Sequence, residues 1–600
     1  IREIAARHGI VICGPNCEGH VNALVPLAAT FSPSLEHAET SLAPDVEGGR
    51  PMAVISQSGG ISFSYLNRGR PRQLRFTYLI SSGNEANVEG FDYVDFMLDE
   101  GRTDIFLMYV EAIKSGDRFR TAAMKAADAG KPLIIAKVGR SEAGRRAAAS
   151  HTGSLAGADS AYDAVFRRYG VVRCDDMDEM LDVAAGFAFC PLPRGRRVGL
   201  LSASGGGAVW MADALSANGL VLGELDPPTT KEIDALIPSY GTSQNPVDLT
   251  AQAVREVGYA RVIDLLRRSP AVDAVVVVGS LASERLLQRD REALARVVAE
   301  SDKPVLFCAY TLASALAIAV LAGCGIPAYT SLGSCARALG ALADYAEFQA
   351  RWRQHTAGDS GVVEAPAARD EISRKLGAAQ KPLTEYEAKG LLAAYGIPRP
   401  AENQVADEDA AAATAVRIGF PVALKVQSGA ITHKTEAGAV ALGLDSEPAV
   451  RAAYRRVLAS ARAAVPGADV QGVLVQRMAA PGVEMIVGVS RDPVFGPIVM
   501  LGLGGIYVEV LGDVVFGPAP LDAEDVRDML ARLRGRRLLE GVRGRPAADV
   551  EALVDVVVRL SRFAADHADA IAEIDLNPVI VHAAGQGVSI VDALIVPRSP

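Results

Sequence analysis

The stretch MAVISQSGG, residues 52–60, carries the pattern on which the fold prediction rests. Residues 52–56 form a short apolar run, as expected of a strand buried on both faces of a parallel sheet. The serines and glycines of 56–60 predict a tight turn into a helix, whose first backbone N–H groups would face an anion. Strand, turn and helix in this order predict an α/β domain.

Similar apolar runs recur through the first half of the chain and predict right-handed βαβ units. They lie at 105–110, 133–136, 198–202, 274–278 and 305–308. We therefore expect two doubly wound domains, at 46–192 and 193–354, separated by the proline-containing segment 187–197. The pattern of apolar and polar residues then changes. Residues 355–380 are predicted to form a linker, and residues 381–600 an α+β domain. In that domain we expect strands at 422–426, 472–476 and 485–489, and helices at about 383–395 and 447–463.

Composition limits the classes of function that the chain can have. A net charge of −10 argues against a general nucleic-acid surface, although local basic loops can still bind anions. No apolar run approaches the ~20 residues that cross a bilayer, and no signal-peptide pattern opens the chain. The seven cysteines are scattered, which predicts reduced thiols and a cytoplasmic location. Because Ile1 begins inside a helical pattern, we expect that an upstream part is missing.

Two histidines lie among small and polar residues that are typical of exposed loops: His151, within 150–157, and His433, within 432–435. An imidazole there could accept a phosphoryl group reversibly and pass it on. For either histidine alone, the alternative is a solvated side chain. Glu111 ends the predicted strand 105–110, at the sheet edge where α/β proteins carry their chemistry, and could orient a histidine ring. It could equally be an ordinary carboxylate at a strand end.

A second Ser-Gly-rich turn, 202–207, follows another predicted strand, so the chain offers two anion-binding turns. Glycine used only for turn geometry is the alternative for each. In the last third, Lys425 and Lys434 suit nucleotide phosphates, while the oxygens of 573–578 and Asp592 suit Mg²⁺. Each of these residues, taken alone, is more often simply solvated.

The order of these motifs resembles that of the NDP-forming acyl-CoA synthetases, which include ADP-forming acetate–CoA ligases and are related to succinyl-CoA synthetase. The resemblance also includes GPNCEG at 14–19, SGNE at 82–85, NPVDL at 245–249 and DLNP at 575–578. It implies a Rossmann-like CoA-binding remnant at 1–45, two flavodoxin-like ligase domains and an ATP-grasp domain at 381–600. With only this remnant, we expect residues before about 44 to pack loosely and CoA binding to be weak.

The resemblance also implies a role for each candidate site residue. His151 matches the phosphorylated histidine, Glu111 its supporting glutamate, and His433 a second histidine that carries the phosphoryl group toward the nucleotide. The residues implied to bind phosphate or CoA are Asn16, Ser58, Gly59, Gly60, Asn84, Ser204, Gly205 and Gly206. Those implied to bind nucleotide are Lys425, Lys434, Gln476, Met478 and Glu484. Those implied to bind Mg²⁺ are Asn577 and Asp592, with Asp575 beside them.

The implied activity interconverts acyl-CoA, ADP and phosphate with a carboxylic acid, CoA and ATP, through an acyl phosphate and a phosphohistidine. The expected partners are these small molecules, without nucleic acid or membrane, and a homodimer is left open. One alternative is a non-catalytic CoA- or nucleotide-sensing module, related to regulatory proteins fused to an acetyltransferase. Another is a different ATP-grasp ligase, which would not need the histidine loop. The presence of His151, Glu111 and His433 favours the synthetase.

Overall fold

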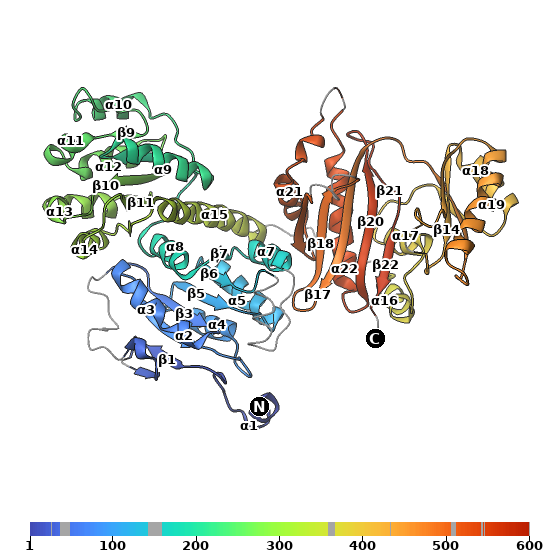
Figure 1. Ribbon diagram of the computed structural model, residues 1–600, viewed down its shortest axis with the longest axis horizontal. Helices are drawn as coiled ribbons and strands as arrows, with labels where there is room; N and C mark the ends of the chain where they lie inside the picture. Colours follow the sequence, from blue (N-terminus) through green and yellow to red (C-terminus); the bar gives the residue numbers. More distant parts are fainter. Residues whose placement is uncertain are drawn as a thin grey trace. The chain divides into compact units, whose positions relative to one another are not determined.

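The computed structural model describes residues 1–25, 27–35, 48–141, 159–357, 367–431, 434–505, 512–541, 544 and 546–598. The chain divides into two units. The first comprises Ile1–Ala156 and Tyr169–Gly358, and the second comprises Gly157–Arg168 and Asp359–Pro600. Figure 1 draws most of the first unit in blue to green and most of the second in yellow to red.

The first unit contains a seven-stranded sheet with the order β2-β1-β4-β3-β5-β6-β7. Its parallel strands are β3 (Met52–Ser56), β4 (Phe76–Ser81), β5 (Ile105–Val110), β6 (Leu133–Lys137) and β7 (Val172–Cys174). Numbered within this domain, their order is 2-1-3-4-5, the flavodoxin-like arrangement. The carboxyl ends of β3, β4 and β5 therefore meet at one edge, where the Ser56–Gly60 turn lies.

A hairpin of β1 (Gly19–Asn22) and β2 (Leu27–Thr30) extends this sheet, with β1 antiparallel to β4. Val21 is fully buried in the core. The expectation that residues before about 44 pack loosely is therefore wrong for this hairpin. Pairing with β4 satisfies the backbone hydrogen bonds of β1, and the Val21 side chain packs in the core of the domain. These contacts hold β1 in place.

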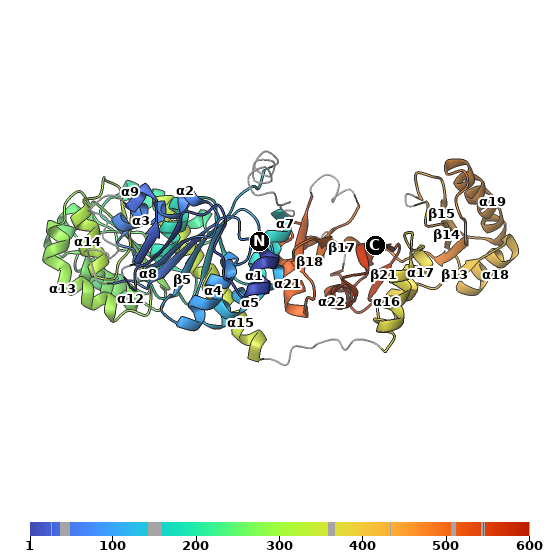
Figure 2. The same ribbon diagram turned by 90° about the horizontal axis from the view of Figure 1, so that it is seen from below.

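Helices cover both faces of this sheet (Figures 1 and 2). The helices are α2 (Gly59–Ser62), α3 (Ser64–Gly69), α4 (Gly90–Glu100), α5 (Gly116–Asp128) and α8 (Met177–Phe189), while α1 (Arg2–His8) lies away from the sheet. α4 and α5 pack together through an edge-to-face pair of Phe91 and Phe119, with ring centroids 5.1 Å apart. On the other face, α8 packs on Leu107 in the main core cluster. Alternate residues of the strands therefore point to opposite helical layers.

The second sheet of this unit has the order β12-β11-β10-β8-β9 and is entirely parallel. Its strands are β8 (Val198–Ser202), β9 (Val247–Asp248), β10 (Ala274–Gly279), β11 (Val305–Ala309) and β12 (Ala328–Tyr329). Its helices are α9 (Gly205–Ala217), α10 (Pro227–Asp234), α11 (Thr250–Glu256), α12 (Tyr259–Arg268), α13 (Arg285–Ala299), α14 (Ala315–Gly323) and α15 (Leu332–Ala357). The local order is again 2-1-3-4-5. One hydrophobic core runs through both sheets by way of α8 and α15.

The second unit begins with a four-stranded antiparallel sheet in the order β13-β16-β14-β15. The strands are β13 (Glu402–Val405), β14 (Val422–Gln427), β15 (Val440–Leu444) and β16 (Gly472–Arg477). Helices α18 (Glu408–Ile418) and α19 (Glu447–Ala464) pack together on one face of it. This sheet carries Lys425 and Gln476 into the site described below.

The larger sheet of the second unit has the order β19-β18-β17-β20-β21, with β22 also paired to β20. The strands are β17 (Val483–Asp492), β18 (Gly496–Leu503), β19 (Val514–Pro518), β20 (Ile571–Val581), β21 (Val588–Ile590) and β22 (Leu594–Pro597). The helices of this part are α16 (Arg369–Ala378), α17 (Glu385–Ala393), α21 (Ala523–Arg532) and α22 (Val550–Asp566). All these pairings are antiparallel.

Of the helices in this unit, only α17 and α19 were expected from the sequence, and two of the others, α16 and α7, change the predicted domain boundaries. α16 occupies much of the predicted linker 355–380, because Ile372 and Leu376, four residues apart, bury a narrow apolar stripe in the core. α7 (Asp159–Arg168) packs on β19, and its Tyr162 ring lies edge-on to Phe495 with centroids 5.1 Å apart. α7 thus belongs to the second unit although the residues after it return to the first.

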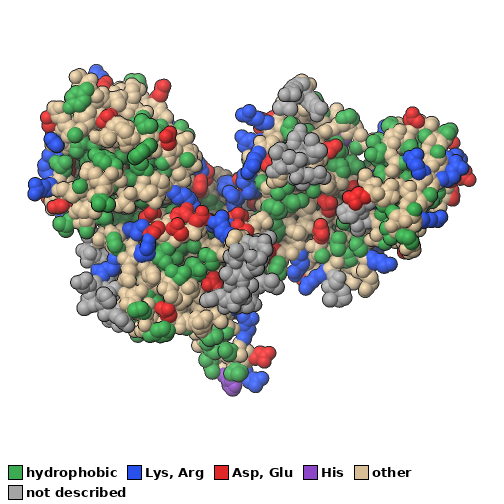
Figure 3. All heavy atoms as spheres, viewed as in Figure 1, with side chains coloured by type: hydrophobic (Ala, Val, Ile, Leu, Met, Phe, Trp, Pro, Cys, Tyr) green, Lys and Arg blue, Asp and Glu red, His purple; other side chains and the backbone are tan. Residues whose placement is uncertain are grey.

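On the face shown in Figure 3, acidic and basic side chains are interspersed across the described surface. Among the described residues, no helix has the length and apolar character needed to span a membrane.

Candidate functional site

The two Ser-x-Ser-Gly-Gly turns of the first unit have the same geometry. Ser56 Oγ accepts a hydrogen bond from Ser58 N at 3.2 Å and donates one to Ser58 O at 2.8 Å. Ser202 Oγ does the same with Ser204, at 3.0 and 2.7 Å. Both turns place a serine immediately before a helix, with the two glycines as its first residues. The backbone N–H groups at these helix starts can bind an anion.

Each of the two turns has a carboxylate side chain beside its first glycine. A Cβ atom added to Gly59 would lie 3.1 Å from Cγ of Glu18, and one added to the equivalent Gly205 would lie 3.5 Å from Oδ2 of Asp248. The Glu18 side chain therefore lies beside the first turn, and the Asp248 side chain lies beside the second. Sequence reasoning did not single out Glu18 as a site residue, because only the folded chain brings it next to Gly59.

Two predicted CoA or phosphate residues, Asn16 and Asn84, lie together. Asn16 Nδ2 donates a hydrogen bond to Asn84 Oδ1 at 3.2 Å, and Asn84 N donates one to Pro15 O at 2.8 Å. Gly83 allows this contact: its φ is +59°, and a Cβ there would lie 2.4 Å from Pro15 O. The motifs at 14–19 and 82–85 thus form one backbone-to-backbone junction.

Gln57 connects the backbone of Glu111 with the carboxylate of Glu85 at this edge of the sheet. Its Oε1 accepts a hydrogen bond from Glu111 N at 2.7 Å, and its Nε2 donates one to Glu85 Oε2 at 2.8 Å. Glu111 is buried at the carboxyl end of β5, as its sequence position predicted. His151 and His433, the two predicted phosphoryl carriers, lie outside the described residues, so the pairing of Glu111 with His151 stays a prediction.

Glu85 is a buried carboxyl whose side-chain oxygens accept hydrogen bonds only from neutral donors among the described residues, although the charge of Lys114 also acts to lower its pKa. Burial raises its pKa to about 7, while hydrogen bonds from Ser82, Gln57 and the Gly90 backbone act in the opposite direction. The Ser82 hydroxyl donates to Glu85 Oε1 at 2.8 Å, and Gly90 N donates to the same oxygen at 2.9 Å. This group is close to half protonated at neutral pH.

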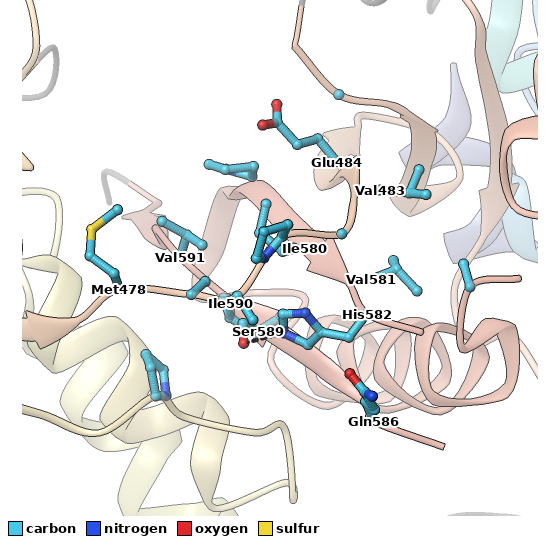
Figure 4. Close-up of a pocket in the computed structure, with 18 of the residues that line it drawn as sticks. Met478, Val483, Glu484, Ile580, Val581, His582, Gln586, Ser589, Ile590 and Val591 are labelled. Atoms are coloured by element: carbon cyan, nitrogen blue, oxygen red, sulfur yellow. Dashed lines mark hydrogen bonds between the residues drawn. The ribbon is translucent and has the colours of Figure 1, made fainter. Parts of the chain in front are cut away.

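A cavity of about 1020 Å³ lies within the second unit. Four of the five predicted nucleotide residues line it: Lys425, Gln476, Met478 and Glu484. Figure 4 shows Met478 and Glu484 on its walls, with Ile580 and Val591 between them. A cavity of this size, mostly apolar and with a few convergent polar groups, has the properties of a cofactor or nucleotide site.

Lysines and carboxylates form a buried cluster beside this cavity. Glu385 accepts hydrogen bonds from Nζ of Lys389, Lys425 and Lys434, at 2.7, 2.8 and 2.7 Å. Burial alone would raise the pKa of Glu385, but the three lysine charges outweigh it and hold that pKa far below its ordinary value. Burial lowers the pKa of Lys425, whereas Glu385 and Asp592 raise that of Lys434 above its ordinary value against the effect of burial. The cluster therefore keeps two phosphate-binding candidates in fixed positions.

Sequence reasoning missed three members of this cluster: Glu385, Lys389 and Glu402. Glu385 follows Thr384, which caps α17 together with Glu387, so an acid there looks like an ordinary solvated helix start. The (i, i+4) spacing of Glu385 and Lys389 was a weak signal for their ion pair. The backbone carbonyl oxygen of Val591 also belongs to the cluster, because it accepts hydrogen bonds from Nζ of Lys389 and from Nζ of Lys425.

The predicted Mg²⁺ residues Asp575, Asn577 and Asp592 line a smaller pocket with Lys434. Burial and the charges of Glu573 and Asp592 raise the pKa of Asp575 to about 6, and Lys434 Nζ lies 2.8 Å from Asp592 Oδ1. Among the described residues, no three His, Cys, Asp or Glu side chains are grouped to hold a metal, so Asn577 is needed as an oxygen donor. Two carboxylates and an amide oxygen fit the donor chemistry of Mg²⁺.

Comparison with known protein families assigns three domains along the chain. A succinyl-CoA ligase-like flavodoxin domain matches residues 49–187, a ligase-CoA domain matches 198–299, and an ATP-grasp domain matches 374–596. An ADP-forming acetate–CoA ligase of Archaeoglobus fulgidus is 32% identical over 98% of this chain and 82% of its own length. The chain belongs to the family of ADP-forming acyl-CoA ligases.

Other relatives of this acyl-CoA ligase differ in the acid that their names give. A 4-hydroxybutyrate–CoA ligase of Nitrosopumilus maritimus is 32% identical over 99% of this chain and 83% of its own length. A solved acetyl-coenzyme A synthetase of Ca. Korarchaeum cryptofilum, in complex with phosphate and ADP, is 27% identical with a TM-score of 0.53. That match covers 60% of this chain and 75% of the solved one. These findings confirm the predicted fold class and support the ligase rather than the sensing module.

Proposed function

We propose that this ligase interconverts acyl-CoA, ADP and phosphate with a carboxylic acid, CoA and ATP. The observation that carries the proposal is the cavity of the ATP-grasp domain, where Lys425, Gln476, Met478 and Glu484 converge. The two anion-binding turns of the first unit support it, because acyl transfer to phosphate needs a site for an anion as well as a site for the nucleotide.

The proposed reaction has three steps in the direction of ATP formation. A phosphate oxygen attacks the thioester carbonyl, and CoA leaves as its thiolate, which takes up a proton. A ring nitrogen of His151 then attacks the phosphorus of the acyl phosphate, and the carboxylate leaves. Finally the phosphoryl group passes through His433 to the terminal oxygen of ADP, which restores each imidazole in turn.

The chain's own residues would share this work between the two units. The turns at Ser58–Gly60 and Ser204–Gly206 would hold phosphate through backbone N–H groups, with Asn16 and Asn84 close by for CoA. Lys425 and Lys434 would hold nucleotide phosphates as point charges. Asp575, Asn577 and Asp592 would hold Mg²⁺, which when bound neutralises charge on the nucleotide phosphates.

We extend the proposal to the location of the reaction. All seven cysteines are free, which is the state expected in a reducing compartment and supports the cytoplasm. The partners in this proposal are the acid, CoA and nucleotide alone.

Replacement of His151 tests the proposal directly. Incubated with Mg²⁺ and ATP labelled in the terminal phosphate, the wild-type chain should acquire acid-labile, base-stable label, as phosphohistidine does. His151→Ala should lose the label carried by residue 151, because the accepting nitrogen is gone, and any label left should be on His433. His8→Ala, which removes an exposed histidine of α1, is the matched control and should label normally. Full labelling of the His151 variant would exclude the proposed role.

His433 is tested by comparing two phosphoryl donors. His433→Ala should block labelling of His151 from ATP, while labelling from an acyl phosphate persists because that donor needs no transfer from the nucleotide site. Loss of both reactions would instead indicate a general defect of the variant and count against the carrier role.

A further inference from the structure

His582 lines the nucleotide cavity with one ring nitrogen unused. His582 directly follows β20 and is 7% exposed. Its Nε2 atom forms a hydrogen bond with Ser589 Oγ at 2.8 Å, in which either atom can be the donor. Its Nδ1 atom is buried and has no hydrogen-bond partner among the described residues. A buried polar atom without a partner is costly, and a bound ligand is one way in which such an atom is satisfied.

The end of β20 places His582 at the border of the cavity. Ile580, Val581 and His582 all line the cavity there, whereas Val579 is fully buried in the core of the larger sheet. Figure 4 shows the His582 ring between Ile580 and Gln586, with Ser589 at its Nε2. Asn577, in the same strand, precedes Ile580 and lines the predicted metal pocket instead. Along the chain, the predicted metal residue Asn577 therefore lies on one side of Ile580 and His582 lies on the other.

The charges of the site fix the direction in which a nucleotide would lie. Lys425 and the metal pocket suit phosphates, so the base would extend into the remaining cavity. The walls of that remainder include Leu538, Pro546 and Ala548, which suit the flat apolar faces of a purine. His582 is one of few polar side chains there, which makes it available to the polar edge of the base.

We propose that Nδ1 of His582 hydrogen-bonds the edge of the purine base of the bound nucleotide. This inference rests on the proposed function, and it adds a residue that recognises the base. The Ser589 hydroxyl can either donate to Nε2 or accept from it, so the neutral imidazole can present Nδ1 as a donor or as an acceptor. An acceptor suits the amino group of adenine, and a donor suits the carbonyl oxygen of guanine. His582 can therefore bond to the edge of either purine and does not choose between the two.

Calorimetric titrations of the full chain with Mg²⁺ test this contact. The probes are ADP, GDP and tripolyphosphate, which has phosphates but no base. His582→Leu should weaken binding of ADP and of GDP by about threefold to tenfold, the range expected for one net hydrogen bond, and leave tripolyphosphate binding unchanged. His582→Asn, whose amide lies close to the position of Nδ1, should restore both affinities. If the leucine variant does not fold, His582→Gln, which places its amide nearer to Nε2, replaces it.

Each other outcome would overturn the inference. Unchanged ADP affinity in the leucine variant would show that His582 makes no contact with the base, while the proposed function would stand. Equal weakening of tripolyphosphate, or failure of asparagine to restore binding, would show that His582 acts through structure alone. If the wild-type chain bound neither ADP nor GDP, the nucleotide site itself, and with it the proposed function, would fall.

Discussion

Glu85 in the first unit and Glu385 in the second are equally buried, each 2% exposed, yet burial has opposite outcomes for them. Glu85 is held by a serine, a glutamine and a backbone N–H, and its pKa rises to about 7. Glu385 is held by three lysines, and its pKa falls far below its ordinary value. Depth therefore does not decide the charge of a buried carboxyl; the charge of its partners does.

The difference matches the sites that the two residues adjoin. Glu85 lies next to Asn84 and, through Gln57, beside the turn that we expect to bind anions, so its raised pKa reduces the negative charge that it adds there to those of Glu18 and Glu111. Glu385 lies among lysines whose positive charges would otherwise be unbalanced in the nucleotide-free chain. In the first unit, anion binding is assigned to neutral backbone groups, and in the second to charged side chains.

The largest effect is expected from Glu385→Ala. The substitution leaves three buried lysines short of a carboxylate, so the second unit should lose about 3–5 kcal/mol of stability, as when other buried pairs are broken. Amide hydrogen exchange in β14 would measure that unit separately, which a single melting curve of a two-unit chain does not. The matched control is Glu371→Ala, which removes another Glu–Lys pair at (i, i+4) spacing that is exposed. Its effect should be far smaller; equal effects would mean that the buried cluster contributes little.

Glutamine substitutions should change stability at pH 8 in opposite directions in the two units. Because folding raises the pKa of Glu85, its contribution to stability falls as pH rises from about 4.5 to 7, by about 3 kcal/mol in all. Glu85→Gln should therefore match wild type near pH 4.5 and exceed it at pH 8. Glu385→Gln should be less stable than wild type at pH 8, and the gap should narrow only in strong acid.

Hydrogen exchange in β3 and β14 at several pH values would follow these two variants. A pH-independent difference between Glu85→Gln and wild type would show that folding does not change the pKa of Glu85, which would remove the contrast with Glu385.

A smaller effect is expected from a substitution beside Glu85. Ser82→Ala removes one hydrogen-bond donor to its carboxylate, and should cost about 1 kcal/mol at pH 8 and raise the pKa of Glu85 further. The fall in stability of the first unit should then begin at the same pH as in wild type but continue to a higher pH. Ser64→Ala, at a half-buried serine bonded only weakly to Gly60 O at 3.5 Å, is the control. Identical pH profiles for the two variants would contradict the role of Ser82.

Much of the fold followed from sequence because its strands are short, continuous apolar runs. The runs at 52–56, 105–110 and 198–202 became β3, β5 and β8 with unchanged bounds. Helix α16 was missed because only Ile372 and Leu376 mark its buried side within a charged stretch. The β1 hairpin was misjudged because its packing depends on β4, more than fifty residues later in the sequence.

The candidate site was only partly predictable. Motif order was enough to choose Lys425, Gln476, Met478 and Glu484, which the structure brings to one cavity. Glu385 could not be chosen, because its three lysine partners come together only when α17 and β14 pack. His582 carried no motif, and it became a candidate only when its unpaired Nδ1 was found in the cavity wall.

Helix α7 gives the chain an uncommon connectivity. It sits on β19 in the second unit, while the residues on either side of it in the sequence belong to the first. Cutting the polypeptide once after Ala357 would therefore leave α7 on the amino-terminal piece, and β19, on which it packs, on the carboxy-terminal piece. The pieces would stay joined by the Tyr162–Phe495 contact and by the Arg168–Asp525 ion pair. A split gene encoding the two pieces would still yield a complex, held together by a helix that each piece alone would leave without its partner.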